Sequence, residues 1–264
     1  MRIWFLLLLA LVTLEASSIS TPLLDVQGDH GTIESAELKV GMSGFVVRHF
    51  DTTHSAIIAN ARVTQTTPPS NRALIIFSEY DGIRQNSLPN GKWSPKAQDE
   101  VIIASDYGRG LLIAPNDDTY NAVSKSIPNI EWTHPDLYAT YLSHEGHPTP
   151  LVSDFHRFCS AGSVGLLYIQ TTETLFTLDC KNFSLLQTLS SNSIGKESKT
   201  PFYSRVPTIR SAWWGEGSSK LESYEPYYLE QIALNNPKNK ELYELYKAKF
   251  GEKSALLRHF DFKE

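Results

Sequence analysis

The first part of the chain after residue 25 has short runs of apolar residues separated by polar turns. The runs are rich in Val, Ile, Phe and Thr and cover residues 43–50, 55–66, 73–80 and 100–104. The stretch 81–99 holds Asn90-Gly91 and two prolines, which favours a loop. Short strands at this spacing are typical of a small antiparallel barrel or sandwich, so residues 25–104 are expected to form a β-rich part.

Helical and strand patterns alternate after residue 104. In order, the sequence predicts a strand, three helices, a hairpin and a last strand, at 111–113, 118–127, 134–145, from 149 onward, 164–179 and 185–189. This order implies helices packed on one face of a sheet. Residues 105–190 are therefore expected to form a mixed α/β part, and the whole chain an α+β fold.

Two of these helices have predicted ends. Thr133 and Asp136 have the spacing of a capping box before the helix 134–145, and Gly146 stands where a helix-ending glycine belongs. The helix is expected to bury an apolar side that consists of Leu137, Tyr138, Tyr141 and Leu142. The next helix is expected to open at Thr149-Pro150, with proline at its first position.

Residues 191–264 are predicted to be a polar loop followed by a helical tail. Helical patterns cover 220–233 and 238–250, with Asn235-Asn236-Pro237 between them. Before the tail, Trp213 and Trp214 stand next to the segment GEGS. We interpret the tryptophan pair as packing the tail onto the domain, with an exposed anchor for a partner as the alternative.

The first sixteen residues are organised as a signal peptide. Arg2 precedes an apolar run of ten residues, Ile3 to Val12, and Ala16 is a small residue at a suitable cleavage point. Spanning a bilayer core takes about 20 residues, so the run is too short for a permanent anchor. We expect an exported protein without a transmembrane segment after cleavage, in the periplasm or on the outer cell surface.

Composition narrows the classes of partner. Hydrophobic residues are 41% of the chain and charged residues 20%, which excludes a largely disordered protein. The net charge is -5 and the lysines and arginines are scattered, so there is no basic face for nucleic acid.

Cys159 and Cys180 flank the predicted hairpin, and in an exported protein a disulfide between them is favoured over two buried thiols. The oligomeric state does not follow from the sequence.

One cluster of residues suggests metal chemistry: His134, Asp136, His144, Glu145 and His147. The zinc-protease motif needs two histidines four apart on one helix, whereas His144 and His147 are three apart with Gly146 between them. We interpret the cluster as capping and surface residues, and keep a periplasmic metal-binding protein or metal-dependent enzyme as an alternative. The sequence has no nucleophile elbow, Walker loop or complete dinucleotide fingerprint, so no catalytic residue, metal or cofactor is predicted.

Several segments together resemble a known family. They are GMSGFVVRHF at 41–50, LLIAPN at 111–116, WTHPDL at 132–137 with GHPTP at 146–150, and VGLLYI at 164–169. In their order and spacing they resemble the N-terminal domain family of the plasminogen-binding protein PgbA, over about residues 26–228. The resemblance implies a non-enzymatic protein of the bacterial envelope or cell surface, whose relatives can capture host plasminogen through lysines.

The resemblance directs attention to the cations of the tail, which are Lys247, Lys249, Lys253, Arg258, His259 and Lys263. Basic and acidic side chains at i, i+3 spacing could imitate the two charges of a C-terminal lysine, the group that lysine-recognising modules bind. The alternative is a solvated helix face. The known plasminogen binders of this family look longer, so a structural or interaction role in the envelope remains a further alternative.

Overall fold

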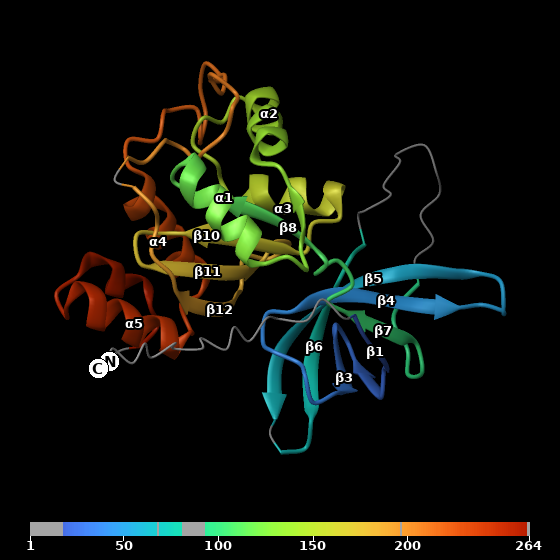
Figure 1. Cartoon of the computed structure of the whole chain (residues 1–264). Coiled ribbons are helices and arrows are strands. Elements are labelled where there is room, and N and C mark those ends of the chain that lie inside the picture. The colour runs from blue at the N-terminus through green and yellow to red at the C-terminus, as the bar shows by residue number, and fades with distance from the viewer. Residues whose placement is uncertain (1–17, 68, 81–92, 196, 263–264) are drawn as a thin grey trace, which may run out of the picture.

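The computed structural model describes residues 18–67, 69–80, 93–195 and 197–262 (Figure 1). The predicted signal peptide, Lys263 and most of the predicted loop 81–99 lie outside the described residues. The fold is α+β, as the sequence predicts. A curled, strand-rich first sheet, which we call the half-barrel, is followed by a second sheet with helices and then by C-terminal helices.

The first sheet is antiparallel and has the strand order β1-β7-β4-β5-β6-β3-β2. Its strands are β1 Ile19–Pro22, β2 Asp25–Gln27, β3 His30–Glu34, β4 Ser43–His49, β5 Ser55–Thr67, β6 Arg72–Ser78 and β7 Glu100–Ile103. The four strands that the apolar runs predict are confirmed as β4 to β7. Alternate side chains such as Val46, Ile75 and Val101 are fully buried, which gives the sheet a continuous apolar inner face.

The second sheet has the order β12-β11-β10-β8-β9 and mixes parallel and antiparallel pairs. Its strands are β8 Arg109–Ile113, β9 Glu131–Thr133, β10 Leu166–Gln170, β11 Thr174–Asp179 and β12 Leu185–Ser190. Parallel neighbours need crossover connections. Helix α1 (Asp117–Ser126) supplies the crossover from β8 to β9, and α2 (Pro135–Glu145) with α3 (Val152–Gly162) supplies the one from β9 to β10.

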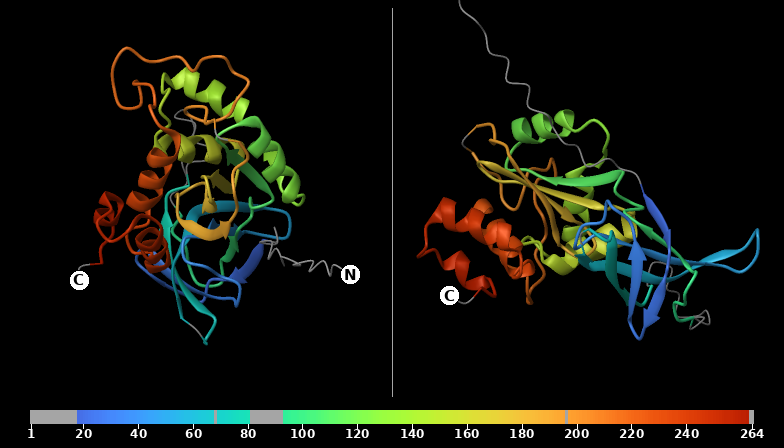
Figure 2. Two further views of the ribbon diagram at one scale, coloured as in Figure 1. Left: turned by 60° about the vertical axis from the view of Figure 1, so that its left-hand side comes forward. Right: turned by 90° about the horizontal axis from the view of Figure 1, so that it is seen from below.

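Both faces of the second sheet are covered. Leu111, Ile113 and Ile169 lie in one apolar core with residues of α2, α3 and α4 (Tyr224–Asn235). On the other face, Leu112 and Tyr168 share a core with α1 and the first sheet. Helix α5 (Lys240–Phe250) and the short 3₁₀ helix η1 (Ala255–His259) complete the chain. Figure 1 and the right-hand view of Figure 2 show these red helices on the side of the second sheet away from the half-barrel.

A buried carboxylate joins the two sheets. Asp179, the last residue of β11, is fully buried, and its Oδ2 accepts hydrogen bonds from the Ser43 N–H (3.0 Å) and the Tyr107 hydroxyl (2.8 Å). Burial raises the pKa of Asp179, while the hydrogen bonds from Ser43 and Tyr107 oppose that shift. Ser43 begins β4, so this carboxylate ties the half-barrel to the second sheet.

The start of α2 differs from the prediction. Thr133 is the last residue of β9, and His134 is the N-cap, whose Nδ1 accepts the N–H of Asp136 at 3.1 Å. The predicted capping box is therefore wrong, because the carboxylate of Asp136 instead binds Arg205 at 2.7 Å. Leu137, expected on the buried side, is 60% exposed. Gly146 ends the helix in the left-handed conformation, as predicted.

Helix α3 begins at Val152 rather than at Thr149-Pro150. The backbone of Thr149 is engaged elsewhere, since its N–H donates to the carbonyl of Gly217 at 3.1 Å. The first turn is held instead by Asp154, whose carboxylate accepts the N–H of Leu151 at 2.9 Å. The far end of α3 carries Cys159, which forms a disulfide with Cys180 with the Cα atoms 5.8 Å apart.

The tail folds against the second sheet through its own apolar residues. Tyr228 and Ile232 of α4 and Leu242 and Tyr246 of α5 are buried in the core that α2 and α3 share. The tryptophan pair takes no part in this packing, because Trp213 is 99% exposed. The expectation that the pair packs the tail is therefore wrong. Of the helices in the described parts of the chain, none is long and apolar enough to cross a membrane.

Candidate functional site

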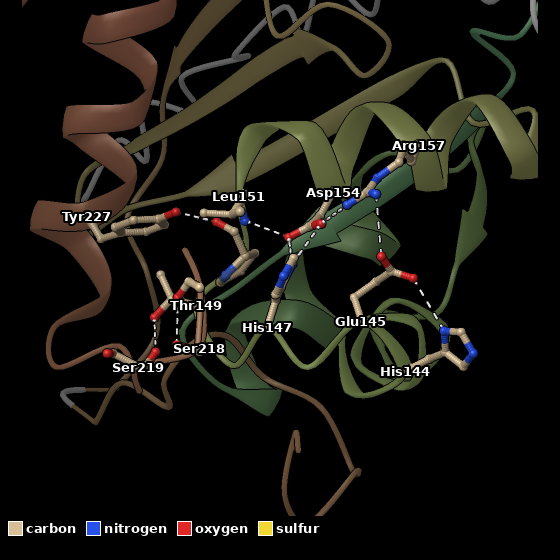
Figure 3. A network of polar contacts seen from close by, with 12 residues as sticks. His144, Glu145, His147, Thr149, Leu151, Asp154, Arg157, Ser218, Ser219 and Tyr227 are labelled. Carbon is tan, nitrogen blue, oxygen red and sulfur yellow. Dashed lines mark hydrogen bonds and ion pairs between the residues drawn. The ribbon is translucent and has the colours of Figure 1, made fainter. Parts of the chain in front are cut away.

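His147 and Asp154 lie at the centre of a polar network at the junction of α2 and α3 (Figure 3). The Nδ1 of His147 is 2.9 Å from Oδ2 of Asp154, and the aspartate side chain is fully buried. Arg157 donates to the other carboxylate oxygen at 2.8 Å and also lies 3.4 Å from Glu145. The buried carboxylate of Asp154 thus contacts the guanidinium of Arg157, the ring of His147 and the N–H of Leu151. Such partners offset the cost of burying a carboxylate.

The remaining members of the predicted metal cluster are spread along α2. Glu145 is 3.3 Å from Nδ1 of the exposed His144, at the C-terminal end of the helix. His134 and Asp136 are at its N-terminal end, about 15 Å away at the usual rise per residue. Within the described residues there is no group of three or more His, Cys, Asp or Glu side chains that could hold a metal ion. The metal alternative therefore has no structural support.

The network closes the turn between α2 and α3 and holds the loop 211–219 against it. Gly146, at φ 78°, accepts the N–H of Ala212 at 2.7 Å, and a β-carbon on Gly146 would lie 2.6 Å from Ala212 Cβ. Thr149 fixes the other end of the loop, because its hydroxyl donates to the carbonyl of Ser219 at 2.7 Å. Between these two anchored ends lie Trp213 and Trp214.

A partly buried tyrosine anchors the same turn to α4. The hydroxyl of Tyr227 donates to the carbonyl of Pro150, and burial raises the pKa of Tyr227.

The role of Asp154 was not predicted, although an acidic residue three positions after a helix N-cap is a recognisable signal. The arrangement serves to position backbone and loop.

The tail cations that the resemblance singles out are distributed over several contacts. Lys249 lies 3.3 Å from Glu173 and 3.8 Å from Glu225, and its side chain is only 20% exposed. Lys247 lies 3.1 Å from Glu252. The tail therefore uses Lys249 to fix α5 against the β10–β11 turn and α4.

Three further tail cations within the described residues, Lys253, Arg258 and His259, lie on or next to the 3₁₀ helix η1. His259 is 3.4 Å from Glu230 of α4. Lys253 and Arg258 are exposed, and Asp261, also exposed, follows Arg258 at i+3. The described members of the predicted set are thus divided between cations paired with acids of the folded chain and exposed cations, while Lys263 lies outside the described residues.

Comparison with known proteins relates the chain to one family. The sequence model described as "Plasminogen-binding protein pgbA N-terminal" matches residues 18–232. The plasminogen-binding protein PgbA of Helicobacter pylori strain J99 is 29% identical over 232 residues, and that of strain 26695 is 28% identical over the same length. Each alignment covers 84% of this chain and 50% of the relative, so the chain spans about half the length of these curated relatives.

No solved structure matches the chain. The matched residues begin before β1, include both sheets and helices α1 to α3, and end within α4. The cations of α5 and η1 lie beyond them. Since the match covers most of its residues, the chain belongs to the family of PgbA N-terminal domains.

Proposed function

We propose that this chain is an exported, non-enzymatic envelope protein that binds plasminogen. The observation that supports it best is the family match over residues 18–232, together with relatives whose name states plasminogen binding. The predicted signal peptide agrees with export to the periplasm or the outer surface. The side-chain network around His147 supports the non-enzymatic role, because its hydrogen bonds hold a turn and a loop in place.

Plasminogen recognition through lysines requires a cation that another protein can reach. Lys253 and Arg258 meet this condition, whereas the amine of Lys249 is largely buried between two carboxylates. A lysine-recognising module binds a cation together with a carboxylate. We therefore assign the contact to Lys253 and Arg258, with the exposed Asp261, three residues after Arg258, as the acidic group.

Because the tail packs into the core, deleting it is not a clean test of this assignment. Deleting residues 238–264 would also remove Leu242, Tyr246 and Phe260 from the core, so loss of binding could follow from unfolding. Point substitutions at exposed positions avoid this problem. The double variant Lys253→Ala/Arg258→Ala is compared with Lys125→Ala, which removes an exposed cation from α1 at the other side of the second sheet.

Binding is measured by surface plasmon resonance on immobilised plasminogen, with the chain from Ser17 onward. We expect the double variant to bind at least about tenfold more weakly, which corresponds to about 1.4 kcal/mol. Lys125→Ala should bind like the parent, and a free lysine analogue such as 6-aminohexanoate should compete. Unchanged binding of the double variant, or no competition by the analogue, would refute the assignment to these two cations.

Export is tested separately by mass spectrometry of the envelope fraction. The expected N-terminal peptide begins at Ser17, after cleavage at Ala16. Recovery of an intact Met1 terminus would contradict export. If export holds and plasminogen does not bind, the alternative of an envelope interaction module becomes the better description of the domain.

A further inference from the structure

Trp213 and Trp214 form the most exposed apolar feature of the described residues. Their exposed fractions are 99% and 84%, while the next most exposed large hydrophobic side chain in the described ranges, Leu137, is at 60%. An isolated exposed apolar residue is common on protein surfaces and needs no explanation. Two neighbouring tryptophans that both point into solvent are different, because indole rings are the largest apolar side chains and are usually well buried.

The loop that carries the pair is held in place rather than frayed. Ala212, directly before Trp213, donates its N–H to the carbonyl of Gly146 at 2.7 Å. On the other side, Gly217 accepts the N–H of Thr149 at 3.1 Å, and a β-carbon at Gly217 would lie 2.9 Å from the Thr149 carbonyl oxygen. The turn between α2 and α3 thus fixes both ends of the loop, and Figure 3 shows the end at Thr149 and Ser219. A fixed loop presents the two rings with little ordering cost on binding.

The area and charge of this loop tip indicate what it binds. If both rings were covered on binding, they would bury about 300–500 Å² of surface. This is less than the roughly 800 Å² that each partner buries in a stable protein interface. Glu216 is the one charged residue within the loop 211–219, and over residues 210–222 Arg210 and Lys220 balance Glu216 and Glu222. A second copy or an anionic surface therefore has little to recognise here. Tryptophan favours the headgroup level of a bilayer, where its ring is in an apolar environment and its N–H remains hydrated.

We propose that the Trp213–Trp214 tip inserts into the headgroup region of a phospholipid bilayer and attaches the folded chain to a membrane surface. The loop lies beside α2 at the top of the view in Figure 1, at the opposite end from strands β3 and β6. Attachment through this tip leaves the half-barrel directed away from the bilayer. Because residues 210–222 carry no net charge, zwitterionic lipid suffices and the attachment does not depend on salt.

The test uses the chain from Ser17 onward, which lacks the apolar run of the leader, and sedimentation with phosphatidylcholine vesicles. The variant Trp213→Ser/Trp214→Ser is compared with Trp93→Ser, which removes a half-exposed tryptophan that packs on Phe50. We expect the double variant to partition at least about tenfold more weakly, and Trp93→Ser to partition like the parent. Parent binding should be the same at about 0.05 M and about 0.5 M salt.

Urea unfolding midpoints equal to that of the parent establish that the variants are folded. The proposal is overturned if the parent does not sediment with the vesicles, or if the double variant sediments as well as the parent. It is also overturned if binding requires anionic lipid and disappears at high salt, since this would indicate a basic surface instead. The same variants are assayed on plasminogen. Retained plasminogen binding with lost vesicle binding separates this inference from the proposed function.

Discussion

Replacing Asp179 with asparagine changes one atom at the junction of the two sheets. In the parent, Oδ2 accepts hydrogen bonds from the N–H of Ser43 (3.0 Å), the hydroxyl of Ser43 (2.5 Å) and the hydroxyl of Tyr107 (2.8 Å). The other oxygen accepts the N–H groups of Lys181 (2.9 Å) and Asn182 (3.1 Å). Every described partner is a donor, and an amide has only one oxygen. One set of donors must therefore face an NH₂ group.

The expected loss of unfolding free energy follows from the number of hydrogen-bond donors that lose their acceptor when Asp179 is replaced. A buried donor left unpaired costs about 1–3 kcal/mol, and the hydroxyls of Ser43 and Tyr107 can rotate, so the backbone N–H groups dominate the cost. Removal of a buried charge offsets part of it. We expect Asp179→Asn to lower the free energy of unfolding by about 2 kcal/mol. Asp179→Ala leaves both sets unpaired and should lower it by about 4 kcal/mol.

The carboxylate of Asp179 also makes the difference in unfolding free energy between the parent and Asp179→Asn depend on pH. Burial raises the pKa of Asp179 in the folded protein above its ordinary value of 3.8, against the hydrogen bonds from Ser43 and Tyr107. The unfolded chain therefore ionises first as pH rises, and the parent loses stability between 3.8 and the folded pKa. Asparagine does not titrate. The difference in unfolding free energy between parent and Asp179→Asn should therefore narrow as pH rises through this window.

The assay is urea unfolding followed by circular dichroism, with the disulfide intact and the chain starting at Ser17. Asp118→Asn, at an exposed position in the first turn of α1, is the control and should change stability by less than about 0.5 kcal/mol. A loss below about 1 kcal/mol for Asp179→Asn at neutral pH would refute the role of this carboxylate at the junction. A difference that widens with rising pH would refute the direction of its pKa shift.

Three further substitutions test other parts of the fold by the same unfolding measurement. Arg48→Met leaves the buried Asp99 without the guanidinium 2.7 Å away and should cost about 3 kcal/mol at neutral pH. Burial raises the pKa of Asp99, but Arg48 and Lys96 together hold the pKa below 3.8. The stabilisation by the Arg48–Asp99 pair is therefore present above that pH, and the cost of Arg48→Met shrinks as pH falls. Cys159→Ser opens a disulfide between residues 21 apart in sequence and should cost about 3 kcal/mol, like reduction of the parent. Gly146→Ala should cost about 1–3 kcal/mol and speed hydrogen exchange of the Ala212 N–H, because it strains a positive φ and crowds that loop.

Where the sequence pattern carries the information locally, it predicts the elements well. Strands β4 to β7 match the apolar runs, and helices α1, α4 and α5 occur where a helical period was found. The short strands β1, β2, β3 and β9 were missed. They have three to five residues each and few apolar side chains, so their extended form depends on pairing with neighbours distant in sequence, such as β1 with β7.

The candidate binding residues also depend on both the sequence and the tertiary structure. The sequence identifies cations in the tail, but whether each is available depends on acids elsewhere in the chain. Lys249 is engaged because the fold brings Glu173 and Glu225 beside it, whereas Lys253 is exposed. The sequence likewise shows that two tryptophans are adjacent. Only the tertiary structure shows that they face solvent, on a loop held at one end by Gly146 and at the other by Thr149.

By itself, then, the sequence determined the types of element, the α+β class and the family, because periodicity and motif order are properties of the chain alone. Only the tertiary structure decided which charges are paired, which carboxylates are buried and which apolar side chains are left in water. Burial and ion pairing depend on groups far apart in sequence, as between Asp179 and Ser43. Such contacts exist only once the two sheets have packed, and no local pattern specifies them.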